Sequence, residues 1–292
     1  MHIDIAGAHS VGARFAEMTE DRKRQVSRKT KARDEKMAEI KSFVRDKLKV
    51  RVFENSDEMG YEAALLTAGL IRTLLEEKET VNMIFAAAPS QDTLLKYLVK
   101  DNSVDWPRIN AYHMDEYIGL SAQTPQSFAS YLKSHIFDLV PFKSVNLLKG
   151  DAEDPEAECE RYSRLLEENP VDIVCLGIGE NAHIAFNDPW VADFEDKKLV
   201  KIVPLDPVCR MQQVHDGCFA SLNDVPEKAL SLTIPALVNA RHMVCSVPKK
   251  SKKDAVRRTV YDEITADVPA SIMRRHKSAV MFCDAESGED IL

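Results

Sequence analysis

Two adjacent carboxylates and an imidazole lie close together in segment 109–120, which reads INAYHMDEYIGL. The apolar first half of this segment is typical of a buried strand, and His113, Asp115 and Glu116 come where that strand is expected to run out into a loop. In parallel α/β sheets, ligands bind just beyond the carboxyl ends of the strands. A carboxylate at that position, such as Asp115, can act as a general base on a carbon atom of a substrate.

A second group of polar residues follows another strand-like run, in segment 177–189, which reads GIGENAHIAFNDP. Its Gly-x-Gly start is expected to let the backbone turn sharply after the strand. His183 then has a carboxylate, Asp188, five residues later, which is an arrangement suited to general acid–base chemistry. A lone histidine is more often a structural residue than a catalyst, so residue types alone leave both roles open.

A third segment could bind an anion. A helix that begins just after the buried run at 81–88 offers free backbone N–H groups, and Ser90 adds a hydroxyl, although serine is also an ordinary helix cap. Cations that could strengthen such a site occur later in the chain, where the alternative is a solvated loop. They are Arg210 and the lysines 249, 250, 252 and 253.

A metal site is the weakest of the chemical interpretations. His113, Asp115 and His183 could together ligate a metal ion for hydrolysis, but they lack the close spacing of a motif such as H-E-x-x-H. We therefore expect no metal.

Strand-like and helix-like segments alternate along the chain, which predicts βαβ units and a mostly parallel, doubly wound α/β sheet with helices on both faces. Neither an internal repeat nor a low-complexity linker interrupts the pattern, so 49–292 is expected to be one catalytic domain. The expected strands are 49–54, 81–88, 109–114, 143–148, 171–179, 199–205, 229–234, 242–247 and 278–283.

Residues 1–48 differ from the rest because charged side chains dominate them. Met37, Ile40, Val44 and Leu48 recur at near-helical spacing, which predicts an amphipathic helix at the end of a charged, helical N-terminal extension. The alternative is a nucleic-acid-binding arm. It is disfavoured because acidic residues interrupt the basic run and no aromatic side chain accompanies it.

Composition limits the class of protein. The 292 residues carry a formal net charge of −8 and have an isoelectric point near 5.6, which argues against general nucleic-acid binding. The six cysteines form no C-x-x-C pair and are expected to be small buried residues in a reducing compartment. Neither a signal peptide nor a membrane-spanning run is evident, so we expect a cytoplasmic protein without membrane contact.

Two of these segments together resemble one known family. MDEYIGL at 114–120 and GIGENAHIAFNDP at 177–189 are similar to the signature segments of the glucosamine-6-phosphate deaminase (isomerase) family, and the resemblance extends over 49–292. It implies a doubly wound α/β domain that converts glucosamine 6-phosphate and water to fructose 6-phosphate and ammonia. It implies no cofactor, an amino-sugar phosphate as the small-molecule partner, and a possible homo-oligomer.

The resemblance also assigns roles to residues. Asp115 would move a proton between C2 and C1, His183 would serve ring opening, and Asp188 would hold that histidine. Asn181 stands where many relatives carry Asp or Glu. Ala182 stands where glycine is usual, so a positive φ there would cost about 1 kcal/mol. The phosphate would be bound by Ser90, Gln91, Arg210 and Lys252.

Two other functions remain open on the same scaffold. One is a sugar-phosphate lactonase, or an isomerase that does not deaminate. The other is a non-catalytic sugar-phosphate sensor.

Overall fold

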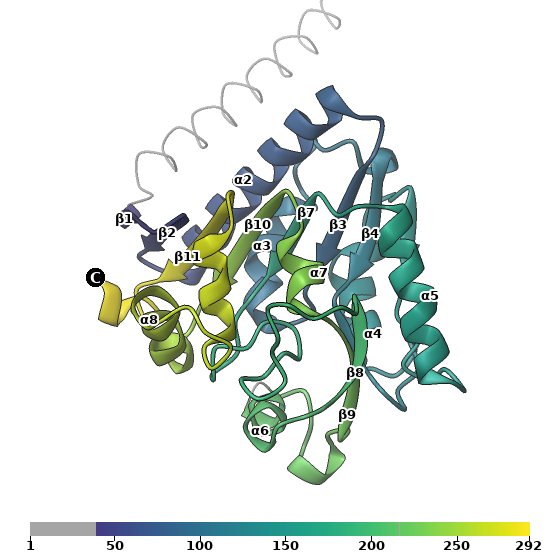
Figure 1. Cartoon of the computed structure of the whole chain (residues 1–292). Coiled ribbons are helices and arrows are strands. Elements are labelled where there is room, and N and C mark those ends of the chain that lie inside the picture. The colour runs from purple at the N-terminus through teal and green to yellow at the C-terminus, as the bar shows by residue number, and fades with distance from the viewer. Residues whose placement is uncertain (1–38, 216) are drawn as a thin grey trace, which may run out of the picture. The chain divides into compact units, whose positions relative to one another are not determined.

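The computed structural model describes residues 39–215 and 217–292 and is built around an eight-stranded sheet (Figure 1). The strand order is β1-β2-β11-β10-β7-β3-β4-β6, and all neighbours pair in parallel except β1 and β2. The predicted mostly parallel α/β sheet is thus confirmed. Its strands are β1 (Glu39–Arg45), β2 (Leu48–Phe53), β3 (Val81–Phe85), β4 (Ile109–His113), β6 (Ser144–Asn146), β7 (Ile173–Leu176), β10 (His242–Val247) and β11 (Ala279–Asp284).

A second, antiparallel sheet contains β5 (Asp115–Tyr117), β9 (Lys228–Leu232) and β8 (Val200–Pro204). Only Met114 separates the end of β4 from the start of β5. The expectation that the chain runs into a loop at Asp115 is therefore wrong. The backbone stays extended there because Asp115 pairs with Ser231 of β9, a partner more than a hundred residues away in the sequence.

Helices cover both faces of the large sheet, as the alternation of side chains along β7 shows. Ile173 and Cys175 pack into the core formed with α2, α3 and α4, whereas Val174 and Leu176 pack into the core formed with α5, α7 and α8. The α-helices are α2 (Ser56–Glu77), α3 (Asp92–Leu98), α4 (Phe128–Leu132), α5 (Pro155–Glu168), α6 (Pro207–His215), α7 (Ile234–Val238) and α8 (Lys253–Tyr261). Short 3-10 helices and one π-helix complete the set: η1 (Pro89–Gln91), η2 (Trp106–Arg108), η3 (Lys133–Phe137), η4 (Leu222–Asp224), η5 (Lys250–Lys252), η6 (Pro269–Arg275) and η7 (Glu289–Ile291).

The helix predicted up to Leu48 is wrong for the part that the structure describes. Strand β1 forms an antiparallel hairpin with β2 and lies at one edge of the large sheet, so the described body begins ten residues before the predicted boundary at 49. The error has a physical source. Ile40 and Val44 are four residues apart, a spacing that fits one face of a helix and equally one face of a strand. The predicted extension at 1–38 lies outside the described residues.

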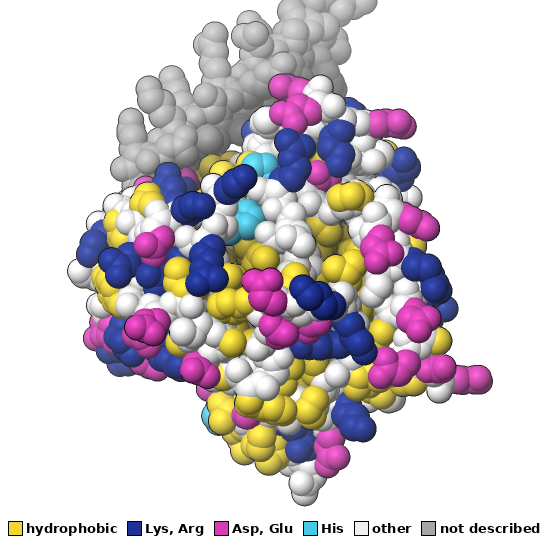
Figure 2. Space-filling view, in the orientation of Figure 1, with side chains coloured by type: hydrophobic (Ala, Val, Ile, Leu, Met, Phe, Trp, Pro, Cys, Tyr) yellow, Lys and Arg dark blue, Asp and Glu magenta, His cyan; other side chains and the backbone are white. Residues whose placement is uncertain are grey.

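The surface carries both signs of charge. On the face seen in Figure 2, Lys and Arg side chains are interspersed with Asp and Glu, and apolar side chains gather near α6, where Val208 and Met211 are exposed. The six cysteines are free thiols and all but Cys218 are buried, in agreement with the sequence prediction. Among the helices that the structure describes, none combines the length and apolar character required to cross a bilayer.

Gly60 allows α2 to pack closely on α3. A Cβ atom at Gly60 would lie 2.2 Å from Thr93 Oγ1 and 2.7 Å from the Thr93 carbonyl carbon, whereas the nearest atom to a Cβ at Gly69 of the same helix is 3.7 Å away. We expect Gly60→Ala to lower the free energy of unfolding by about 1–3 kcal/mol through overpacking. The control Gly69→Ala should raise it by about 0.4–1 kcal/mol. Denaturant unfolding measures both, and equal effects would contradict the packing argument.

Candidate active site

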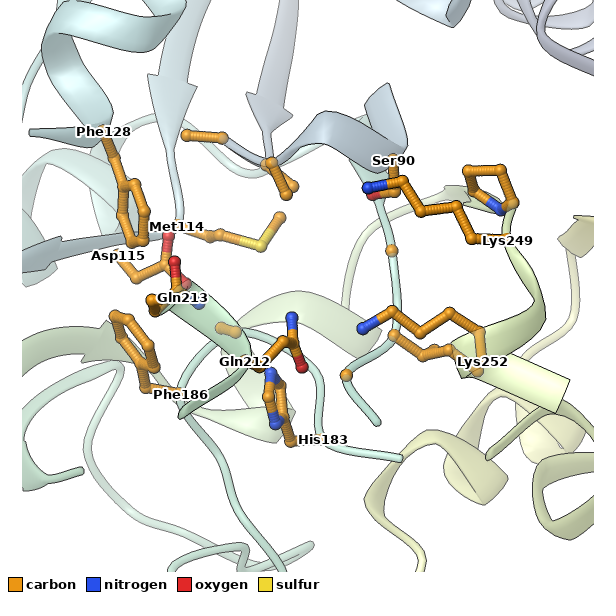
Figure 3. A pocket seen from close by; sticks show the side chains of 18 residues that line it. Ser90, Met114, Asp115, Phe128, His183, Phe186, Gln212, Gln213, Lys249 and Lys252 are labelled. Atoms are coloured by element: carbon orange, nitrogen blue, oxygen red, sulfur yellow. The ribbon is translucent and has the colours of Figure 1, made fainter. Parts of the chain in front are cut away.

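One cavity lies where the carboxyl ends of β3, β7 and β10 meet the small sheet (Figure 3). Strand β7 is hydrogen-bonded to β3 on one side and to β10 on the other, so the segments that follow these three strands converge. The cavity volume is about 650 Å³, part of it open to solvent. Its polar lining comes from Ser90, Asp115, His183, Gln212, Gln213, Lys249 and Lys252, and its larger apolar lining from Met114, Phe128, Ile178 and Phe186.

Asp115 faces this cavity from β5 (Figure 3), and the cavity is also lined by Phe128 and Phe186, whose rings stack on each other with centroids 5.6 Å apart. Asp115 is only 8% exposed. Burial raises the pKa of Asp115 well above its usual range, and the neighbouring Glu116 carboxylate raises it further. Once ionised, a carboxylate with a raised pKa is a stronger base than an exposed aspartate.

Glu116 points to the other side of β5 and has a structural role. Its Oε1 accepts the N–H of Phe128 at 3.1 Å and its Oε2 accepts the N–H of Ala129 at 2.9 Å, so the side chain caps α4. Burial raises the pKa of Glu116 to about 7. Successive residues of a strand face opposite sides, so only the first carboxylate of the Asp-Glu pair reaches the cavity.

His113 is also structural. It is fully buried in β4, and its Nε2 accepts the N–H of Leu148 at 2.7 Å. Burial lowers the pKa of His113 to about 3, which keeps the imidazole neutral. It does not line the cavity that Asp115 and His183 share. The metal-ligand set of His113, Asp115 and His183 considered from the sequence is therefore not assembled.

His183 lines the cavity and is held from behind by Asn181 and Asp188. Its Nδ1 lies 2.8 Å from Asn181 Oδ1 and 3.1 Å from Asp188 Oδ1, and the Asn181 amide donates to the same Asp188 oxygen at 2.8 Å. Both neighbours of Nδ1 are acceptors, so this nitrogen carries the proton and Nε2 remains for a ligand. Burial opposes ionisation of Asp188, but hydrogen bonds from His183 and Asn181 outweigh it and the pKa is lowered.

The glycines of the Gly-x-Gly segment make room for side chains and do not supply a left-handed turn. A Cβ at Gly177 would lie 2.6 Å from Ser90 Oγ, and a Cβ at Gly179 would lie 2.1 Å from Cε1 of His183. Positive φ values occur instead at Ala182, at 67°, immediately before the histidine, and at Ala185, at 47°. The strained conformation considered for Ala182 is thus present, at a cost of about 1 kcal/mol relative to glycine.

The end of the cavity opposite Asp115 is polar and basic (Figure 3). Ser90 lies there, in η1 after β3, and Lys252 reaches it from η5 with only 5% of its area exposed. Gln91, which the resemblance assigned to the phosphate, does not line the cavity. It donates through Nε2 to Ser90 Oγ and to the Leu176 carbonyl, both at 3.0 Å, so it orients Ser90 from behind.

Arg210 is not in the cavity wall, which corrects its predicted contact with phosphate. Its Nη2 donates to the carbonyl of Leu222, the first residue of η4, at 2.9 Å and to the carbonyl of Val225, the residue after η4, at 2.8 Å. The guanidinium stabilises the turn between α6 and β9, because it pairs carbonyl oxygens there. Its sequence context, after a strand and a turn, did not distinguish this role from anion binding.

Comparison with known proteins assigns the family. The family model described as glucosamine-6-phosphate isomerases/6-phosphogluconolactonase matches residues 54–282. The chain belongs to this family. Its relatives include deaminases and lactonases, so the family is one of enzymes that act on sugar phosphates.

Curated relatives and solved structures agree with this family. The chain is 31% identical to glucosamine-6-phosphate deaminase of Lactobacillus delbrueckii subsp. bulgaricus over 244 residues, which covers 81% of this chain and 97% of the relative. It is 32% identical to glucosamine-6-phosphate deaminase of Streptococcus sanguinis over 240 residues, which covers 82% of this chain and 97% of the relative. Among solved structures, a monomeric glucosamine-6-phosphate deaminase superposes with a TM-score of 0.74 at 28% identity, covering 82% of this chain and 98% of the other. A 6-phosphogluconolactonase from Thermotoga maritima superposes at 0.66 with 20% identity, covering 82% and 100%, and shows the fold alone.

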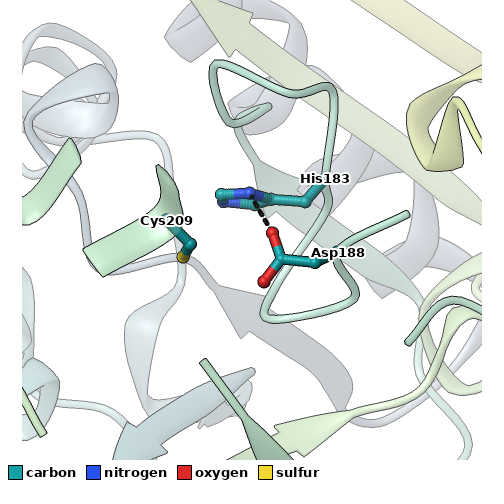
Figure 4. A group of neighbouring side chains, drawn as sticks. All are labelled: His183, Asp188 and Cys209. Carbon is teal, nitrogen blue, oxygen red and sulfur yellow. Dashed lines mark ion pairs between the residues drawn. The ribbon is translucent and has the colours of Figure 1, made fainter. Parts of the chain in front are cut away.

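His183 and Asp188 also form, with Cys209, a group whose possible ligand atoms lie within 4.8 Å of one another (Figure 4). Burial raises the pKa of the Cys209 thiol, as does the nearby Asp188 carboxylate, so the sulfur stays protonated. A protonated thiol is a poor metal ligand. The contacts therefore favour a hydrogen-bonded His–Asp pair backed by a buried thiol.

Three lining residues have no role in the sequence-based site. Gln212 and Gln213 come from α6, and Lys249 precedes η5. Nothing in the sequence marks the glutamines, because their position depends on contacts between α6 and the segment after β7, where the Glu180 N–H donates to Gln212 Oε1 at 3.0 Å. The lysine-rich turn was noted as a possible anion contact, but the sequence does not separate Lys249 from its neighbours.

The buried imidazole of His113 predicts an acid-dependent stability. Its pKa is near 6.5 in an unfolded chain and about 3 in the fold, so the unfolded state binds more protons as the pH falls below 6.5. Titration of His113 then lowers the free energy of unfolding by up to about 1.4 kcal/mol for each pH unit below 6.5. His113→Gln retains an acceptor and removes the titration. We expect the stability advantage of wild type over this variant, measured by denaturant unfolding, to shrink between pH 7 and pH 4, and a constant difference would contradict the assignment.

Proposed function

We propose that the protein converts glucosamine 6-phosphate and water to fructose 6-phosphate and ammonia. The observation that carries this proposal is that Asp115, His183, Ser90 and Lys252 all line one cavity, with Asp115 on the opposite side from Ser90 and Lys252 (Figure 3). Relatives that bear the name glucosamine-6-phosphate deaminase support the same reaction.

Binding begins at the basic end. The phosphate is held by Ser90 and Lys252, and this contact is remote from the carbons that react. Such binding energy positions the sugar so that C1 and C2 lie near Asp115.

Ring opening belongs to His183. Because Asn181 and Asp188 both accept from Nδ1, Nε2 is the nitrogen that takes the proton of the C1 hydroxyl and passes it to the ring oxygen as the C1–O5 bond breaks. The Asp188 carboxylate stabilises the imidazolium formed in this step, since its pKa is lowered and it stays ionised. Asn181 orients the ring but cannot itself carry the proton.

Asp115 performs the isomerisation. It removes the proton from C2 of the open-chain 2-ammonium aldehyde while O1 takes up a proton released by the ammonium group. Asp115 then returns the C2 proton to C1, which leaves a hydroxyl at C1 and an iminium group at C2. Water then adds to C2 and ammonia leaves, giving the ketone. Burial of Asp115 raises its pKa and therefore its strength as a base once it is ionised.

Asp115→Asn tests the base directly. We expect kcat for ammonia release from glucosamine 6-phosphate to fall by about 10²–10⁴-fold, while KM changes little because the phosphate contacts remain. The control is Asp254→Asn on the exposed face of α8, which should match wild type. A coupled ammonia assay gives both constants. Hydrolysis of 6-phosphogluconolactone without ammonia release, or binding of sugar phosphates without turnover, would contradict the proposal.

The pH profile should reflect the raised pKa of Asp115. The acidic limb of kcat/KM is expected well above the ordinary aspartate value of about 3.9, because the base must be ionised. Glu116→Gln removes a neighbouring negative charge and keeps an oxygen to cap α4. Ionisation of Asp115 becomes easier, so the limb should move to lower pH. An unmoved limb in this variant would show that another group controls it.

A further inference from the structure

The turn between β10 and α8 and the start of α8 contain four lysines, and their side chains lie in different surroundings. Lys253 pairs with Glu289 at 3.3 Å and with Asp290 at 3.0 Å, outside the cavity. Lys250 is exposed and does not line the cavity. Lys249 and Lys252 both line it. Lysines near a helix N-terminus oppose the helix dipole, so the two that face the cavity call for a functional explanation.

Lys249 has a backbone conformation that favours glycine. Its φ is 79° and its ψ is 142°, a combination that residues with a Cβ atom rarely adopt. The surroundings impose it. The Lys249 N–H donates to Asp284 Oδ2 at 3.0 Å, and its carbonyl accepts the N–H of Lys252 at 3.1 Å. Asp284 is itself 95% buried, with 5% exposure, and its Oδ1 accepts the N–H of Ser287, so this anchor is fixed.

This conformation directs the Lys249 side chain over the basic end of the cavity. In Figure 3 the Lys249 side chain extends towards the side of the cavity that Ser90 lines, and the Lys252 ammonium also points into the cavity. Arg210, the other cation that the sequence offered, is directed to the carbonyls around η4. The cationic end of the cavity therefore consists of two lysines and a hydroxyl, and the buried Asp115 carboxylate lies on the opposite side (Figure 3).

We propose that Lys249 is a substrate-binding residue that, together with Lys252 and Ser90, selects a doubly ionised phosphate group over singly charged groups. Two ammonium groups match a dianion in charge, whereas a sulfate ester or a carboxylate leaves one of them unbalanced. The strained backbone at 249 is then retained because it brings the second cation to the phosphate. The identity of the sugar rests on the proposed function, but the charge selection does not.

Two substitutions distinguish the effect of the Lys249 charge on substrate binding from the effect of its strained backbone on stability. Lys249→Gln removes the charge and keeps the strained backbone, whereas Lys249→Gly removes both. We expect KM for glucosamine 6-phosphate to rise about tenfold or more in each variant, with kcat retained, since a charge-assisted contact is lost. Only Lys249→Gly should also raise the midpoint of thermal unfolding. The matched control is Lys250→Gln, one residue away, which should leave KM and the midpoint unchanged.

Isothermal titration calorimetry makes the test independent of turnover. Fructose 6-phosphate and glucosamine 6-sulfate are the probes. Wild type should bind the phosphate more tightly than the sulfate, and Lys249→Gln should reduce that preference about tenfold. If wild type releases no ammonia but shows this pattern, the proposed reaction fails and the role of Lys249 stands. Unchanged phosphate binding in both Lys249 variants, an equal loss in Lys250→Gln, or no binding of the phosphate to wild type would each overturn the inference.

Discussion

The absence of a side chain at two positions after β7 is the steric constraint on which the cavity depends. A Cβ at Gly177 would meet Ser90 Oγ, and a Cβ at Gly179 would meet the imidazole of His183. Ser90 and His183 can therefore both approach the cavity only because the short backbone segment 177–179 carries no side chain at these two positions. Because β7 is paired with β3 and β10, this stretch lies between the segments that carry Ser90 and the lysines. The central strand of the sheet therefore serves both the core and the site.

Two buried carboxylates at the site have pKa values shifted in opposite directions, and the difference separates their roles. Asp188 accepts hydrogen bonds from His183 and Asn181, which outweigh its burial and keep it ionised. Asp115 is buried and adjoins the Glu116 carboxylate, so its protonated form is favoured. Pairs of carboxyl groups with divergent pKa values are a common basis for dividing acid–base tasks. Here one carboxylate orients an imidazole and the other is suited to move a proton.

Backbone strain is concentrated around the same cavity. Ala182, which precedes the imidazole, and Lys249, which borders the basic end, both have positive φ although neither is glycine. Positions of this kind persist only where surrounding contacts over-determine them, and they cluster at functional sites. The two packed cores on either side of the large sheet provide the rigid support that such positions require.

The sequence by itself determined the parallel sheet, the position of Asp115 and the His183–Asp188 pair, because strand periodicity and polar residues after strands are local signals. It assigned β1 to a helix, since a spacing of four suits either element. Only the tertiary structure decided which carboxylate of Asp115–Glu116 faces the cavity, that Gln91 and Arg210 support neighbouring segments, and that Lys249 lines the same cavity as Ser90. Those outcomes depend on contacts between residues far apart in the chain, such as Asp115 with Ser231 and Lys249 with Asp284, and no local pattern encodes such contacts.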